Sequence, residues 1–107
     1  HAWVGGAPSG LPLLLLHGLG GLAQEVMAPL EPLSDSFRLI APDRPGYGFS
    51  DPLPSGEMSP AGQAGWLTAL LDRLGIRRCL LLAHSIAAAP ALTLALTVPE
   101  RLAGLVL

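Results

Sequence analysis

Residues 80–89 read LLLAHSIAAA, and this stretch decides the fold class. A continuous apolar run without alternation is typical of a strand that is buried on both faces of a sheet. The run ends at Ala83, and the alanine- and leucine-rich residues 86–98 that follow favour a buried helix. The sequence therefore predicts a strand over 79–83 that turns directly into a helix, with Ser85 at the turn.

Three other apolar runs have the same character and are predicted to be strands of the same sheet: residues 11–16, 37–41 and 102–107. Helical patterns separate them. One begins after Ser59 and ends at Gly75, and a weaker one over 24–33 is interrupted by two prolines. Strands that alternate with helices predict an α/β fold with a mostly parallel sheet of about four strands and helices on both faces. Residues 2–10 (AWVGGAPSG) contain turn residues and are interpreted as the tail of a hairpin.

The chain has 107 residues and a formal net charge of -2, so it forms one domain or less. All six basic residues are arginine, and this balance gives no electrostatic support for binding nucleic acid or an anionic membrane. Cys79 is the only cysteine, which excludes an internal disulfide and a metal site built from cysteines. No apolar stretch reaches the roughly 20 residues that a membrane span needs. Because the sequence starts at His1 and stops within an apolar run, we expect it to be a piece of a longer protein.

Ser85 lies between two small residues, Ala83 and Ala87, at the predicted strand-to-helix turn. A nucleophilic serine held on such a turn exposes its hydroxyl above the sheet edge, and the residues two positions away must be small because they approach the backbone. The backbone N–H of Ile86, at the start of the helix, would then face a developing oxyanion. The alternative interpretation is that Ser85 only caps the helix.

A glycine-rich turn, HGLGG at residues 17–21, follows the first main strand. Such a turn lets backbone N–H groups face the space above the sheet, and Leu19 is placed to offer a second oxyanion donor. We interpret His17 and Gly18 as residues that support this loop. Taken alone, the motif also fits a plain turn between a strand and a helix.

A third motif, DRPGYGFSD at residues 43–51, forms a turn-rich loop that begins with a carboxylate. We interpret Asp43 as a residue that supports this loop. In a doubly wound sheet, strand 11–16 is expected beside strand 79–83. The glycine-rich turn and the Ser85 turn would then meet above the carboxyl edge of the sheet.

Three segments, in this order, resemble the N-terminal half of proteins with the α/β-hydrolase fold: HGLGG, FRLIAPDRPGYGFSD and LLLAHSIAAAPALTLALTVPERLAGLVL. The resemblance implies that residues 1–107 are the N-terminal part of a single α/β-hydrolase domain, whose intact parent hydrolyses an ester or related acyl bond. Ser85 would be the nucleophile that forms an acyl-serine intermediate, and Leu19 and Ile86 would supply the oxyanion hole. The implied partner is a small-molecule acyl substrate, and the resemblance implies no metal and no organic cofactor.

The rest of a catalytic triad is missing from the sequence. In this fold the chain order is Ser, then Asp or Glu, then His. After Ser85 the only carboxylate is Glu100, and there is no histidine. His84 is adjacent to Ser85, and its side chain is expected to point elsewhere. We therefore expect the acid and the base to lie beyond Leu107, and we expect the 107-residue chain by itself to be inactive as a hydrolase.

Two other functions stay open at this point. Gly18-x-Gly20-x-x-Ala23, with Asp43 about 20 residues further on, fits the fingerprint of a dinucleotide-binding site. Against this interpretation, prolines interrupt the helix that should follow the glycine turn. The chain could also belong to a family member that has lost its triad and serves as a non-catalytic binding module.

Overall fold

The computed structural model describes residues 1–107 as an α/β fold on one five-stranded sheet, with strand order β1-β3-β2-β4-β5. The strands are β1 (Ala2–Gly6), β2 (Leu11–Leu16), β3 (Phe37–Pro42), β4 (Cys79–Ala83) and β5 (Leu102–Val106). The strands β2 to β5 are the four predicted from the sequence, and they run parallel to one another. The predicted α/β fold with a mostly parallel sheet is confirmed, and β1 adds a fifth strand.

The N-terminal strand corrects the expectation of a hairpin. β1 and β2 are consecutive in the chain, but β3 lies between them in the sheet. β1 runs antiparallel to β3, from Ala2 opposite Pro42 to Gly6 opposite Arg38. The turn residues in the sequence mark where the chain reverses, but they carry no information about which strand becomes the neighbour.

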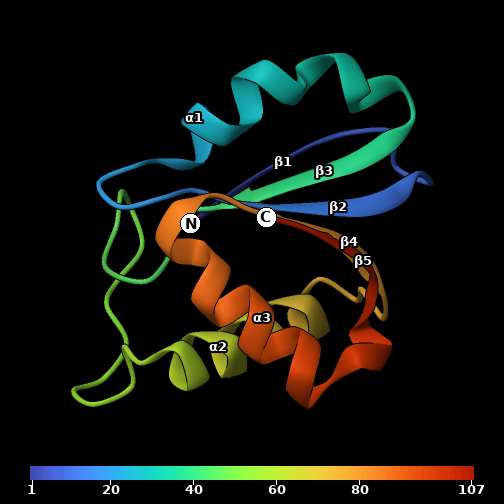
Figure 1. The fold of residues 1–107 in the computed structure, drawn as a ribbon. Helices are drawn as coiled ribbons and strands as arrows, with labels where there is room; N and C mark the ends of the chain where they lie inside the picture. The colour runs from blue at the N-terminus through green and yellow to red at the C-terminus, as the bar shows by residue number, and fades with distance from the viewer.

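Helices cover both faces of the sheet, as predicted (Figure 1). α1 (Ala23–Met27) and the 3-10 helix η1 (Ala28–Asp35) lie on one face, and α2 (Pro60–Arg73) and α3 (Ala88–Thr97) lie on the other. Two short 3-10 turns, η2 (Ser85–Ala87) and η3 (Pro99–Arg101), precede α3 and β5. No helix has the length and apolar character that crossing a membrane would require.

The weak helix predicted over residues 24–33 is divided between α1 and η1. Pro29 lies at the start of η1 and Pro32 lies inside it. Because proline has no N–H to donate and clashes with the preceding turn, the α-helix does not continue past Met27, and tighter 3-10 turns replace it.

The leucine run of β2 contributes to both halves of the core. Leu14 and Leu16 belong to the larger apolar cluster, which includes residues of α2 and α3. Leu13 and Leu15 belong to the smaller cluster, which includes residues of α1. The run lacks alternation because both faces of the strand are covered.

Cys79 is buried in the larger cluster, and this burial raises the pKa of its thiol to about 11, so the thiol stays protonated and unreactive at neutral pH.

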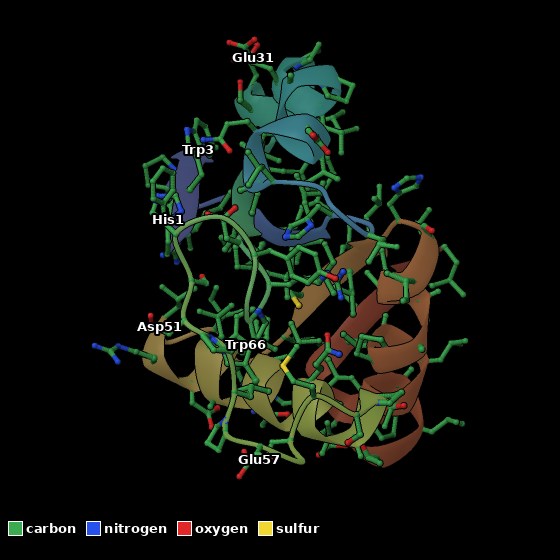
Figure 2. The ribbon with its side chains drawn as sticks, turned by 90° about the vertical axis from the view of Figure 1, so that its left-hand side faces the viewer. His1, Trp3, Glu31, Asp51, Glu57 and Trp66 are labelled. Carbon is green, nitrogen blue, oxygen red and sulfur yellow. The ribbon has the colours of Figure 1, made fainter.

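A long loop connects β3 to α2, and Asp51 and Glu57 lie along it (Figure 2). α2 begins where the sequence predicts, because the hydroxyl of Ser59 accepts a hydrogen bond of 3.1 Å from the N–H of Gly62. Trp66 of α2 is partly buried against the larger core cluster.

The glycine-rich turn at residues 17–21 and the turn at Ser85 lie at the same edge of the sheet. β2 and β4 are direct parallel neighbours, so their carboxyl ends are adjacent. The backbone N–H of His84 donates a hydrogen bond of 3.0 Å to the carbonyl oxygen of Leu16, which joins the ends of the two strands. The predicted neighbourhood of strands 11–16 and 79–83 is therefore confirmed.

Candidate functional site

Ser85 occupies the sharp turn between β4 and α3. Its φ is 58°, and it is the only residue other than glycine with a positive φ. For an L-residue this backbone conformation costs about 1–2 kcal/mol. Contacts of the surrounding structure must offset this conformational energy, as is common at functional sites. Ala83 and Ala87 are buried at 1% and 0% exposure, which leaves no space for a larger side chain. Ala87 has a φ of -66°, so the strained conformation falls on Ser85 and not on that alanine.

Ser85→Gly is expected to have a free energy of unfolding about 1 kcal/mol higher than Ser85→Ala, because glycine adopts positive φ without a Cβ clash. Neither variant has a hydroxyl, so the comparison isolates the backbone. Chemical denaturation of the complete protein that contains these residues measures the difference. Equal stabilities would show that the turn is not strained.

The glycine-rich turn packs directly against the Ser85 turn. A Cβ added to Gly18 would lie 3.3 Å from the Cβ of Ser85 and 2.9 Å from Nδ1 of His84, so a side chain at this position would push the two turns apart. The side chain of Leu19 is 73% exposed, and its backbone N–H donates none of the loop hydrogen bonds. Ile86 follows Ser85 in the first turn of η2, where N–H groups have no partner within a helix. The predicted residues are thus close to one another.

His17 is fully buried beneath this turn and is hydrogen-bonded through both ring nitrogens. Its Nε2 accepts a hydrogen bond of 2.9 Å from the backbone N–H of Arg44, so the ring proton is on Nδ1, which donates to the carbonyl oxygen of Gly18 at 2.9 Å. Burial lowers the pKa of His17, and the charge of Arg44 acts in the same direction. A neutral imidazole with both nitrogens bonded has no free nitrogen to act as a base toward Ser85.

The lowered pKa of His17 predicts loss of stability in mild acid. The unfolded chain binds a proton at His17 near pH 6.5, whereas the folded chain binds it only at lower pH. Below about pH 6.5 the unfolded state therefore binds more protons, and the free energy of unfolding decreases as the pH falls toward the folded-state pKa. Urea denaturation between pH 7.5 and about 5 should show a shallower decrease for His17→Asn than for wild type. Identical slopes would contradict the prediction.

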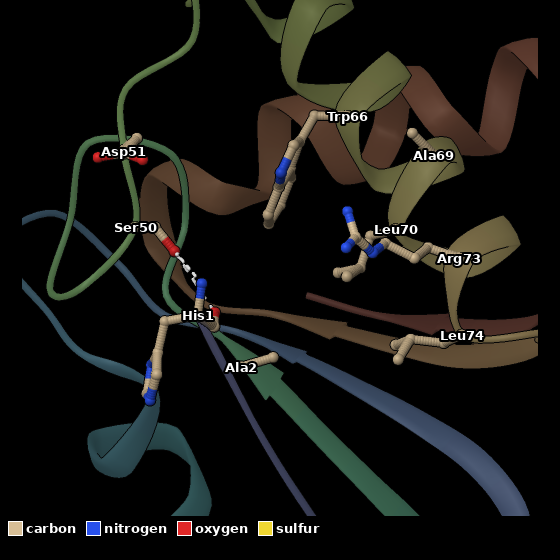
Figure 3. Close-up of a pocket in the computed structure, with 9 residues that line it drawn as sticks. All are labelled: His1, Ala2, Ser50, Asp51, Trp66, Ala69, Leu70, Arg73 and Leu74. Carbon is tan, nitrogen blue, oxygen red and sulfur yellow. Dashed lines mark hydrogen bonds between the residues drawn. The ribbon is translucent and has the colours of Figure 1, made fainter.

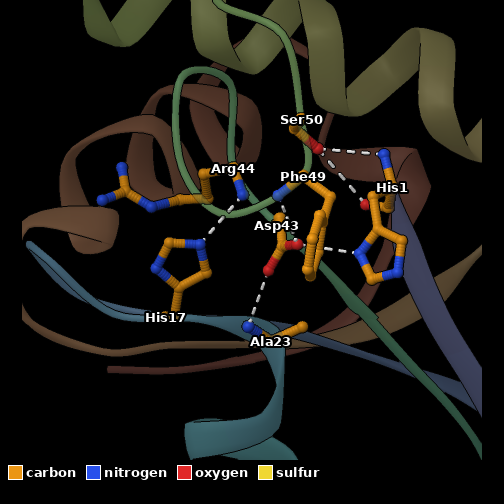
Figure 4. Close-up of polar contacts among 7 residues, drawn as sticks. All are labelled: His1, His17, Ala23, Asp43, Arg44, Phe49 and Ser50. Atoms are coloured by element: carbon orange, nitrogen blue, oxygen red, sulfur yellow. Dashed lines mark hydrogen bonds and ion pairs between the residues drawn. The ribbon is translucent and has the colours of Figure 1, made fainter.

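Asp43 is fully buried and connects three segments of the chain (Figure 4). Its Oδ1 accepts a hydrogen bond of 2.9 Å from the N–H of Ala23, the first residue of α1. Its Oδ2 accepts one of 3.1 Å from the N–H of Phe49 and lies 2.7 Å from Nδ1 of His1. A Cβ on Gly48 would collide with the carboxylate, so the loop can close around Asp43 only with glycine at that position. The carboxylate links β1, α1 and the loop after β3.

The contacts of Asp43 leave no dinucleotide site. The fingerprint requires an acidic residue that is free to bind a ribose hydroxyl and a helix N-terminus that is free to bind the pyrophosphate. Here Asp43 is inaccessible to solvent. The N–H of Ala23 at the start of α1 already donates a hydrogen bond to the carboxylate of Asp43, so it is not free to bind a phosphate. α1 is also only five residues long. The geometry therefore contradicts the dinucleotide-binding interpretation.

Arg44 is a residue of the site that the sequence did not single out. The residue is 3% exposed. Its guanidinium lies 4.7 Å above the ring of Tyr47 and donates to the side chain of Gln63 at 3.1 Å and to the carbonyl oxygen of Gly18 at 3.2 Å. Its Nε is buried without a partner. An arginine in a Pro/Gly-rich loop is usually exposed, and no sequence signal connects it to Gly18, 26 positions earlier.

No acidic or basic side chain within residues 1–107 is hydrogen-bonded to Ser85. The ring of His84 packs against Gly18 and lines an open cavity of about 380 Å³ together with Glu25, and it makes no hydrogen bond to Ser85. Glu100 precedes β5, so it lies at the amino edge of the sheet, opposite the edge that carries Ser85. No three His, Cys, Asp or Glu side chains gather into a group that could hold a metal ion.

The largest cavity lies away from this site. It has a volume of about 680 Å³ and is located between the start of β1 and α2, where Trp66 points from the helix toward His1 and Ser50 (Figure 3). None of the predicted site residues lines it. The candidate site is therefore the open surface above the carboxyl ends of β2 and β4, where Gly18 and His84 line the cavity of about 380 Å³.

The fold agrees with that of similar proteins. The chain is 36% identical over 100 residues to the 2-hydroxymuconate semialdehyde hydrolase of Pseudomonas putida, across 92% of this chain and 36% of that protein. It is 33% identical over 95 residues to the dihydrolipoyllysine-residue acetyltransferase component of the acetoin cleaving system of Cupriavidus necator, across 89% of this chain and 25% of that protein. The structure of a thermophilic esterase from Thermogutta terrifontis matches with a TM-score of 0.88 and 34% identity, across 98% of this chain and 38% of the esterase.

The chain thus spans between a quarter and two fifths of the length of these proteins. The family model for the alpha/beta hydrolase fold matches residues 12–107, which is nearly the whole chain. The resemblance that the three sequence motifs predicted is confirmed, and the chain belongs to the alpha/beta hydrolase fold family.

Proposed function

We propose that the complete protein is a serine hydrolase that cleaves an ester or a related acyl bond through an acyl-serine intermediate on Ser85. Residues 1–107 would form the N-terminal part of its catalytic domain. The observation that carries the proposal is the backbone of Ser85, an exposed serine held at a φ of 58° between β4 and the following helix. This is the placement that a nucleophile requires above the sheet edge.

In the proposed reaction, Oγ of Ser85 attacks the acyl carbon while its proton passes to a base that lies outside residues 1–107. The former carbonyl oxygen becomes an oxyanion, which the N–H groups of Leu19 and Ile86 would stabilise. The bond to the leaving alcohol then breaks, and the alcohol takes the proton from the base. Water attacks the acyl-serine in the second half-reaction, which releases the acid and restores the hydroxyl of Ser85.

The similar proteins support hydrolysis as the reaction class. By name, one of them is a hydrolase and another is an esterase. The esterase supports an oxygen ester of a small molecule as the substrate class. The roles proposed for His17, Gly18 and Asp43 are structural, because their hydrogen bonds are made with the loops and not with Ser85.

Covalent labelling with a fluorophosphonate tests the proposal. The reagent reacts with activated serine nucleophiles, and cleavage of the labelled protein after Arg78 and Arg101 releases residues 79–101, in which Ser85 is the only serine. We expect one label per protein molecule on this peptide. Ser55→Ala, which removes an exposed serine without a side-chain hydrogen bond, should label like wild type, and Ser85→Ala should not label. A wild-type protein that takes no label would favour the non-catalytic binding module.

A further inference from the structure

We propose that Arg44 is a positioning residue for the oxyanion hole. Its guanidinium, together with His17, holds the carbonyl oxygen of Gly18 so that the N–H of the same peptide group, which belongs to Leu19, faces the oxyanion formed at Ser85. This inference rests on the proposed function and adds to it a residue whose side chain does not touch the substrate.

The first observation is the saturation of one carbonyl oxygen. The oxygen of Gly18 accepts hydrogen bonds from Nδ1 of His17 at 2.9 Å, from the guanidinium of Arg44 at 3.2 Å and from the N–H of Gly21 at 3.3 Å. A carbonyl oxygen has two lone pairs, so three donors hold it firmly. Two of the three donors come from side chains that are almost completely buried.

The second observation follows from the geometry of the peptide group. In a trans peptide the C=O and N–H bonds point in opposite directions within one plane. Because the oxygen of Gly18 points toward the buried side chains, the N–H of Leu19 must point away from them. That N–H donates none of the loop hydrogen bonds, and Gly18 lies next to Ser85. The contacts on the oxygen therefore set the direction of the proposed donor.

The third observation is that the buried guanidinium of Arg44 forms no ion pair. Its hydrogen-bond acceptors are the neutral oxygens of Gly18 and Gln63, it forms no ion pair, and its Nε has no partner. Burying a cation in this way is unfavourable for folding. The same low-polarity surroundings strengthen its action on the peptide group, which becomes a better donor at its N–H end. A cation one peptide group behind the oxyanion would stabilise the negative charge that forms there.

Kinetics of three Arg44 variants of the complete protein test the inference. Arg44→Met keeps the apolar contact but removes the donor and the charge, Arg44→Gln keeps a donor only, and Arg44→Lys keeps the charge and one donor group. We expect kcat to decrease in the order wild type, Lys, Gln, Met, with a loss of about 10²–10³-fold for Met, as for the removal of one oxyanion donor. KM should change little, because the interaction is made in the transition state.

Binding of phenylboronic acid separates positioning from a general structural role. The acid forms a tetrahedral adduct with a serine nucleophile, so its Ki should increase in parallel with the loss of kcat/KM. The melting temperature of Arg44→Met should stay close to that of wild type, because the lost hydrogen bonds are offset by the removal of a buried charge that forms no ion pair. Arg73→Met, which changes an exposed arginine of α2 without hydrogen bonds, should match wild type in all three measurements.

Two results would overturn the inference: a folded Arg44→Met with wild-type kcat, or a loss that appears only in KM. If Arg44→Met does not fold, equal kcat values for folded Arg44→Lys, Arg44→Gln and wild type would overturn it as well. Failure of the proposed function would be seen differently, because the wild-type protein itself would then show neither turnover nor labelling at Ser85.

Discussion

Ser85→Ala is expected to lower kcat of the complete protein toward esters by about 10⁴–10⁶-fold. The proposed reaction passes through a covalent bond between Oγ of Ser85 and the acyl carbon, and alanine has no atom that can form this bond. A residual rate above that of water alone should remain, because the N–H groups of Leu19 and Ile86 would still be in place. KM should change much less than kcat.

Steady-state hydrolysis of p-nitrophenyl acetate and butyrate measures this effect. Ser55→Ala serves as the matched control, because it removes a hydroxyl from an exposed loop serine, and its kcat should equal that of wild type. Circular dichroism should show that both variants are folded. A Ser85→Ala variant that keeps more than about a tenth of wild-type kcat would show that the reaction does not use this serine as its nucleophile.

Asp43→Ala is expected to lower the free energy of unfolding by about 3–5 kcal/mol. The substitution leaves the buried N–H groups of Ala23 and Phe49 without an acceptor and removes the partner of His1. It also leaves a cavity in the centre of the loop. The same carboxylate holds the start of β1, α1 and the loop after β3 together. The substitution should therefore destabilise all three segments.

Urea denaturation of the complete protein measures the loss, with Asp51→Ala as the control. Asp51 belongs to the same loop but is exposed, and its substitution should change the free energy of unfolding by no more than about 0.5 kcal/mol. Asp43→Asn keeps one acceptor oxygen, so its free energy of unfolding should lie between those of Asp43→Ala and Asp51→Ala. Equal stabilities for Asp43→Ala and Asp51→Ala would show that the buried carboxylate does not hold the loops together.

Most of the fold could be predicted because its cause is local in the sequence. The unbroken leucine run of β2 indicates a strand covered on both faces, and Ser59 marks the start of α2 through its own hydroxyl. The position of Ser85 at a turn could be predicted for the same reason, since a strand that ends in a small residue, then His84, Ser85 and a helix follow one another.

The parts that could not be predicted depend on contacts between distant segments. β1 pairs with β3 although its turn residues indicate only a reversal before β2. Arg44 reaches Gly18 and Gln63 only because the loop after β3 folds back over the carboxyl ends of the strands. The sequence pattern shows that the flanking alanines are small, but only the backbone shows that the positive φ falls on Ser85.

A crystal structure of the complete protein after reaction with a phosphonate ester tests whether Ser85 is the nucleophile. We predict a covalent bond between phosphorus and Oγ of Ser85, with one phosphonyl oxygen about 2.7–3.1 Å from the backbone nitrogens of both Leu19 and Ile86. The carbonyl oxygen of Gly18 should still face Arg44 and His17. An adduct on another residue would show that Ser85 is not the nucleophile, and a phosphonyl oxygen that contacts neither N–H group would show that Leu19 and Ile86 do not form the oxyanion hole.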